Sequence, residues 1–399
     1  MRRLLLALLL AGAACRSRPA VAMPPYGNME AAHARLSAMG EVAPEDEALF
    51  RCELATAAIC CGDEAGAWRA LHAASRVMGT LESSSQENLR AILGSEATKT
   101  WKGDPYERCM GALYKGLLYW RRGDLDNAAA CFKNGLFADG YSEVGEHQTD
   151  FAVLSFLLGW VNTLRGREEQ ARFSFEEARA NMPKNPWFAD PRPGECNVLA
   201  VIDIGRGPKK YATGGGDALV KFAAYPRLEA GVEILVDGVS KGRSAPGVDL
   251  YLQAITRGKK VIDGIRKGKA VFQGGTFVAG VVLIHEGVRR DKGGMVAVGA
   301  GLLLLSALTD PRADTRHWTL LPGEVHVLPL SIAPGRRQVE VRVLDPGGRP
   351  IPGWSRTFAV DVGAARDSLY YFRPMPGYGI HGLLGPPGPP AMTQEGDAR

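Results

Sequence analysis

The residue types that most often carry out chemistry are scattered along this chain. Of seven histidines, only His317 and His326 stand close together, and no pair of carboxylates accompanies them at the spacing of metal ligands. The sequence has no G-x-S-x-G, H-E-x-x-H or Walker motif. The stretches GRGPKK (205–210) and TGGGDALVK (213–221) place glycines beside lysines, as phosphate-binding loops do, but neither matches a known fingerprint. We therefore interpret them as ordinary loops and expect no cofactor, no metal and no catalytic residue.

The most concentrated set of candidate residues is ADTRHW (313–318). Asp314, Arg316 and Trp318 could form the site of an envelope enzyme. Alternatively, they form an ion pair and an aromatic plug that lock helical and strand-rich parts together. We favour the second interpretation because no nucleophile or metal-ligand set accompanies them.

The N-terminus resembles the signal peptide of a bacterial lipoprotein. Arg2 and Arg3 precede an apolar run at residues 4–10, and AGAAC then ends at Cys15. The run is too short to span a bilayer, so we predict a cleaved signal within residues 1–22 and lipidation of Cys15. Gly12 departs from the leucine usual at its position. The alternative is cleavage after AVA (20–22), which would leave a secreted protein without lipid.

Composition restricts the remaining classes. The 399 residues are 46% hydrophobic and 23% charged, which is typical of a globular protein, and a net charge of +5 does not indicate nucleic-acid binding. Seven cysteines occur without a C-x-x-C motif. Export would permit disulfides, but we favour small buried helix residues for several of them.

A spacing of small residues recurs three times, with steps of 7, 5, 4 and 3 residues. The copies are Ala55, Gly62, Ala67, Leu71 and Ala74; Gly116, Gly123, Ala128, Phe132 and Gly135; and Gly159, Gly166, Ala171, Phe175 and Ala178.

This spacing resembles the tetratricopeptide repeat, a pair of antiparallel helices. Small residues let the helices approach, and the glycine at the second position ends the first helix. We expect Gly116 and Ala128 at the helix crossing, with Tyr119 and Phe132 filling the space between repeats. The predicted helical domain covers residues 26–186.

In such an array, one side of each first helix lines a concave groove. Its predicted residues are apolar and aromatic, with one arginine: Leu113, Leu117, Trp120, Arg121, Phe156, Trp160, Thr163 and Leu164. Trp and Arg are frequent binding hot spots. An apolar surface of this size needs a cover, either a partner protein or the C-terminal part of this chain.

After residue 186 the pattern changes to short alternating segments separated by glycine and proline, which predicts strands. We expect a mixed domain at 196–373 with a small antiparallel sheet or sandwich, and a disordered tail at 374–399. The fold class is α+β. Apolar runs at 276–284 and 295–308 are read as buried helix or strand, with shallow membrane contact as the alternative. The basic stretch 257–269 is either a solvated face or a contact with anionic lipid headgroups.

Four stretches, at 102–132, 200–210, 313–328 and 334–343, resemble an uncharacterised family of bacterial envelope lipoproteins. The resemblance covers residues 102–373, and ADTRHW is its most specific part. It implies an outer-membrane-associated protein, found alongside lipoproteins of the curli-secretion type, and Arg16 after the cysteine fits outer-membrane delivery. We therefore expect a non-enzymatic, lipid-anchored scaffold or assembly factor that faces the periplasm and binds other envelope lipoproteins. A soluble periplasmic or secreted protein is the alternative.

Overall fold

The computed structural model describes residues 26–79, 99–140, 151–256 except 215, 216 and 218, and 313–383 except 364 and 366. The predictions for Cys15 and the signal segment, for 257–269, and for the apolar runs at 276–284 and 295–308 lie outside the described residues.

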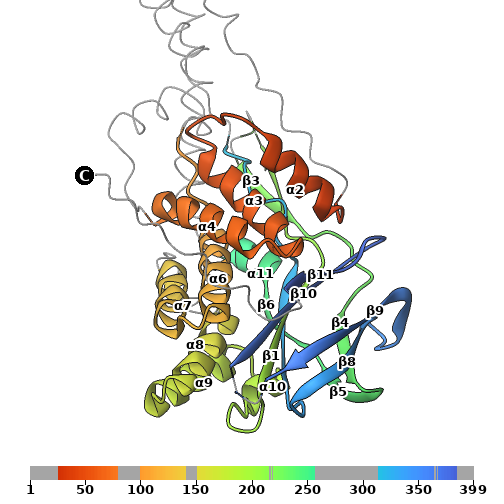
Figure 1. The fold of residues 1–399 in the computed structure, drawn as a ribbon. Coiled ribbons are helices and arrows are strands. Elements are labelled where there is room, and N and C mark those ends of the chain that lie inside the picture. The colour runs from red at the N-terminus through yellow and green to blue at the C-terminus, as the bar shows by residue number, and fades with distance from the viewer. Residues whose placement is uncertain are drawn as a thin grey trace, which may run out of the picture.

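The first half of the chain is helical (Figure 1). Its elements are α2 (Met29–Ala38), α3 (Glu47–Cys60), α4 (Glu64–Met78), α6 (Pro105–Arg121), α7 (Leu125–Gly140), α8 (Ala152–Leu164), α9 (Glu168–Asn181) and α10 (Pro186–Ala189). Three helix pairs, α3–α4, α6–α7 and α8–α9, coincide with the three copies of the spacing. Gly62, Gly123 and Gly166 join each pair with φ of +79°, +77° and +69°. Only glycine adopts such angles without strain, which explains its place in the repeat.

In the second and third repeats, the glycine at the head of the repeat admits an aromatic ring from the partner helix. A Cβ atom added at Gly116 would lie 2.3 Å from the Phe132 ring, and one at Gly159 would lie 2.8 Å from the Phe175 ring. This corrects the expected place of Phe132, whose ring fills the space within its own helix pair. Gly135 instead stands at the junction of repeats, where an added Cβ would lie 2.6 Å from Leu154.

The described residues of the second half form three sheets (Figure 1). Its elements are β1 (Val198–Ile204), β2 (Lys209–Thr213), β3 (Leu219–Ala223), β4 (Gly231–Val236), β5 (Val239–Arg243), β6 (Ala245–Asp249), α11 (Leu250–Thr256), β7 (Glu324–Leu330), β8 (Gly335–Leu344), β9 (Pro350–Val362), β10 (Ser368–Met375) and β11 (Gly379–Leu383). A five-stranded sheet has the order β11-β10-β1-β7-β6, with β1 and β10 parallel. A four-stranded antiparallel sheet has the order β5-β4-β8-β9, and β2 pairs with β3.

The five-stranded sheet is the middle of three layers. On β1, Ala200 and Ile202 join a core with the four-stranded sheet, whereas Leu199 and Val201 join the core of the helical array. Every residue of β1 and β7 is buried. Burial on both faces explains why the residues of β1, VLAVIDI, are all apolar except for one aspartate. The α+β class is thus confirmed.

One boundary is corrected. The expected disordered tail began at residue 374, but β10 continues to Met375 and β11 follows as its antiparallel neighbour. Gly377 makes the turn with φ of +74°. Ile380 and Leu383 are then buried in the two cores, and this burial is what orders the segment.

All six cysteines among the described residues are free thiols, and Cys52, Cys60, Cys109 and Cys196 are buried.

The repeat geometry yields a matched pair of substitutions on α6. Gly116→Ala places a methyl group inside the Phe132 ring, and overpacking of this kind costs about 1–3 kcal/mol. Gly111→Ala places its methyl group 3.5 Å from Met78 Cε, an ordinary contact, and gains helix propensity. Chemical denaturation should therefore show Gly116→Ala destabilised and Gly111→Ala unchanged or stabilised. Equal stability of the two variants would mean that α6 and α7 do not pack through Gly116.

Candidate functional site

The predicted concave groove is closed by strand β10 of the same chain. Trp120 Nε1 donates to the Asp367 carbonyl at 2.8 Å, and Arg121 Nη1 donates to the Leu369 carbonyl at 2.7 Å. Arg121 Nη2 also binds Glu64 Oε1 at 2.7 Å. The sequence allowed two covers for this groove, a partner protein or the C-terminal part of this chain. The structure shows the second, because the chain's own sheet covers the groove.

The burial of the groove residues agrees with these contacts. Fully buried are Leu113, Leu117, Trp120, Arg121, Phe156 and Trp160, while Thr163 and Leu164 are half-buried. The groove is therefore not an open surface for a partner protein. The apolar face of a helix can be buried equally well by a partner protein or by a sheet of the same chain, and here the sheet buries it.

The ADTRHW segment joins the sheet to the helices. Arg316 binds Asp314 and Asp46, each at 2.7 Å. The Trp318 ring lies in the helical core, where its Nε1 donates to Thr56 Oγ1 at 2.9 Å. These are the ion pair and the aromatic plug that the sequence suggested as one alternative.

Two buried carboxylates on the helices hold the backbone that follows this segment. Glu107 Oε1 accepts from the Trp318 amide at 2.6 Å. Glu53 accepts from the amides of Thr319 at 2.6 Å and Leu320 at 3.0 Å. Burial raises the pKa of Glu53 to about 7 and that of Glu107 to about 8. The polar groups of this region are thus occupied by contacts within the chain.

A buried ion pair lies within the five-stranded sheet, on the side that meets the helices. Asp203 on β1 and Arg373 on β10 are fully buried, with Arg373 Nη1 3.8 Å from Asp203 Oδ2. The hydroxyls of Tyr114 and Tyr371 donate to that oxygen at 2.5 and 2.6 Å. Loss of either charged partner leaves an uncompensated buried charge, which typically costs about 3–5 kcal/mol. We assign this network a structural role.

The glycine-rich stretch at 205–210 also serves the interface. Lys210 lies on β2, and its Nζ binds Asp104 Oδ2 at 2.9 Å with only 7% of the side chain exposed. Its charge is therefore neutralised within the chain. The loop interpretation of the two glycine-rich stretches is partly corrected, since residues 209–210 belong to β2 and residues 219–221 to β3.

The structure places a serine, a histidine and a glutamate in a row, which are the residue types of a catalytic triad. These residues were not identified from the sequence. Ser244 Oγ lies 3.1 Å from His326 Nδ1, and His326 Nε2 lies 2.8 Å from Glu324 Oε2. The feature of the sequence that could have indicated this row is the separation of Glu324 and His326 by two positions on one strand. However, the ring is 1% exposed and Ser244 Oγ accepts from the Val232 amide at 3.0 Å. The row therefore joins β4 and β7 to Ser244, which lies between β5 and β6.

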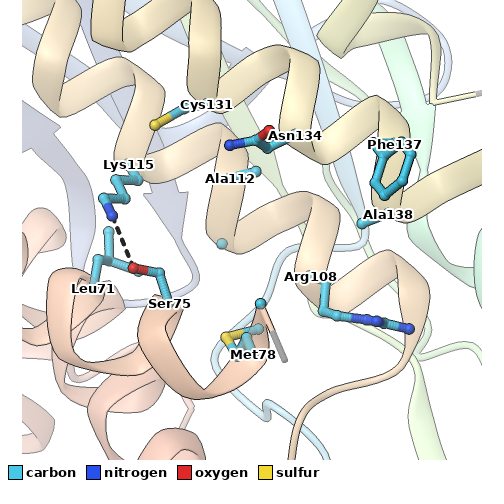
Figure 2. A pocket seen from close by; sticks show the side chains of 12 residues that line it. Leu71, Ser75, Met78, Arg108, Ala112, Lys115, Cys131, Asn134, Phe137 and Ala138 are labelled. Atoms are coloured by element: carbon cyan, nitrogen blue, oxygen red, sulfur yellow. Dashed lines mark hydrogen bonds between the residues drawn. The ribbon is translucent and has the colours of Figure 1, made fainter. Parts of the chain in front are cut away.

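An open cleft lies where the first two repeats meet, between α4, α6 and α7 (Figure 2). Its volume is about 330 Å³, within the range of ligand-binding sites. Leu71 and Met78 of α4 and Gly111 and Ala112 of α6 give it an apolar lining. Phe137 of α7 stands at its edge with 63% of its surface exposed. No pattern in the sequence singled out this set, because its members come from three helices.

Polar groups of the cleft are few. Lys115 Nζ donates to Ser75 Oγ at 2.8 Å across the cleft, and Arg108 extends along its other end (Figure 2). Burial raises the pKa of Cys131 to about 11, so this residue is a neutral thiol at pH 7 and a poor nucleophile. The cleft is equipped for binding through apolar contact and positive charge.

Within the described ranges, no group of three or more His, Cys, Asp or Glu residues is arranged to hold a metal ion. None of the helices in that part of the chain is both long enough and apolar enough to cross a membrane.

Comparisons with family models, with curated proteins and with solved structures find no match to this chain.

The buried carboxylates predict a pH dependence of stability. An acid whose pKa is raised on folding binds more protons in the folded state, so the free energy of unfolding falls as pH rises. For Glu53 this loss occurs between its ordinary pKa of 4.5 and about 7. Denaturation at pH 5 and pH 8 should show wild type less stable at pH 8, with a smaller difference in Glu53→Gln. The control is Glu47→Gln on the same helix, whose side chain is 54% exposed. An unchanged difference in Glu53→Gln would contradict the assignment.

Proposed function

We propose that this chain is a non-enzymatic, lipid-anchored envelope protein that binds a protein partner as a scaffold or assembly factor. Support for the location comes from the signal-like segment ending at Cys15 and from the family resemblance. Support for a binding role comes from the repeat array, since stacked helix pairs present extended surfaces to other proteins. Other envelope lipoproteins are the expected class of partner.

The observation that carries the proposal is the cleft between α4, α6 and α7. The concave face, where such arrays usually bind, is covered by β10. The cleft combines an apolar lining with the exposed ring of Phe137. Exposed apolar residues around a concavity are a common mark of a binding site. The partner therefore contacts the junction of the first two repeats.

The enzyme alternative, with a site around Asp314–Trp318, has less support. Arg316 is held by two aspartates and Trp318 is buried among helices. A substrate would have to displace contacts that hold the layers together.

The lipid anchor is tested by Cys15→Ser. Diacylation of Cys15 would hold the protein in the membrane fraction, so the variant should move to the soluble fraction on cell fractionation. Mass spectrometry of the wild-type N-terminus provides the control. An unmodified mature N-terminus at Met23, with fractionation unchanged by the substitution, would contradict the anchor.

Partner binding is tested by two matched substitutions of exposed phenylalanines. Phe137 borders the cleft, whereas Phe173 on α9 is 69% exposed and does not line the cleft. From detergent-solubilised envelopes, Phe137→Ser should lose the partner that wild type and Phe173→Ser retain. Both variants should keep the wild-type circular dichroism and melting temperature, because an exposed ring contributes little to folding. Equal retention of the partner by Phe137→Ser and Phe173→Ser would contradict a site at the cleft.

A further inference from the structure

The cleft holds two cations without an acidic counterpart in the described part of the chain. The ion pairs found there include neither Arg108 nor Lys115. Among the residues that the structure describes, the hydrogen bond of Lys115 Nζ goes to the neutral Ser75 hydroxyl, at 2.8 Å. The two residues are seven positions apart on α6, so they lie two helical turns, or about 10 Å, apart along its axis. Positive charge thus stands at both ends of the cleft.

Arg108 adds an unsatisfied donor. Its Nε is shielded from solvent and has no hydrogen-bond partner among the described residues. A buried donor without an acceptor destabilises the structure that contains it. A carboxylate is the acceptor that best matches the planar fork of a guanidinium. The geometry therefore favours a ligand that brings a carboxylate to this end of the cleft.

The space between the cations is apolar. Gly111 and Ala112 lie between Arg108 and Lys115 on the same face of α6, three and four positions after Arg108. Met78 faces them from α4, and an unbranched thioether adapts to ligands of different shape. A Cβ added at Gly111 would meet Met78 at 3.5 Å and nothing nearer. Bulky apolar side chains thus fit against small residues here.

We propose that the cleft binds an acidic amphipathic helix of a partner protein. Its two carboxylates lie seven residues apart and pair with Arg108 and Lys115. Apolar side chains three and four residues after the first acid enter the cleft between them. This pattern is the complement of the Arg108, Gly111, Ala112 and Lys115 face of α6, and it follows the usual anchors of a helix in a groove. The inference rests on the proposed function and names the chemistry of its partner.

The charge arrangement favours a helix over a lipid. An anionic lipid brings its charge at one end, with the acyl chains extending away from it. Here the cations lie at opposite ends, with the apolar surface between them. A ligand with acid, apolar and acid groups in that order satisfies all three parts of the cleft.

The test uses two fluorescein-labelled peptides, AAEAALLAAEAAA and its glutamine counterpart AAQAALLAAQAAA, with the full-length chain in detergent. Fluorescence anisotropy should show tighter binding of the acidic peptide and weaker binding as salt rises. Arg108→Gln and Lys115→Gln should each weaken it about two- to fivefold. Lys133→Gln on α7 is the control, since it removes the same charge from an exposed residue that does not line this cleft. Gly111→Leu, which adds a bulky side chain to the cleft lining and keeps both charges, should weaken binding more than either charge variant.

Several outcomes would overturn the proposal. The first is equal affinity of the two peptides, or none. The second is binding of phosphatidylglycerol vesicles that Arg108→Gln and Lys115→Gln abolish while the peptide stays unbound, which would assign the cleft to membrane headgroups. The third is a chemical cross-link from the cleft to residues 80–98 of the same chain in wild type. If Phe137→Ser loses the envelope partner but the charge variants retain it, the proposed function stands and the acidic helix is wrong.

Discussion

The five-stranded sheet is buried on both faces, and this constraint determines the rest of the structure. The four-stranded sheet covers one face, and the helical array must cover the other. Strands such as β1, with seven buried residues in succession, would be insoluble without both layers. The concave face of the helices is thus used for folding, and binding has to occur elsewhere on the array.

Polar contacts fix how the helical layer and the sheet align, because apolar contacts alone allow the two layers to shift relative to each other. The carboxylates of Glu53 and Glu107 hold consecutive backbone amides from Trp318 to Leu320. The Asp203–Arg373 pair joins β1 to β10, and Arg373 Nη1 also donates to the Leu320 carbonyl. A buried polar group without a partner is costly, so contacts that pair Glu53 and Glu107 with backbone amides discriminate against other arrangements of sheet on helices. A rigid unit of helices and sheet in turn fixes the shape of the cleft at the junction of α4, α6 and α7.

The helix pairs were predictable because their signals are local and steric. Gly123 ends a helix and Gly116 admits a ring, and both requirements appear as residue types at fixed spacing. The Trp318 plug was also foreseen as one of two alternatives. What covers Trp120 could not be foreseen, since its partner Asp367 lies 247 residues away and an apolar helix face does not specify its cover. The cleft was missed because its lining combines small residues of α6 with Met78 of α4, which proximity in the sequence does not reveal.

The central claim is that the sheet closes the concave face of the helices, so that both form one cooperative unit. Native-state hydrogen exchange measured by mass spectrometry tests it most directly. The account predicts that the amides of α6 and β10 open only with global unfolding, with equal free energies and equal dependence on denaturant. Exchange of α6 in a separate, lower-energy opening while β10 stays protected would contradict it.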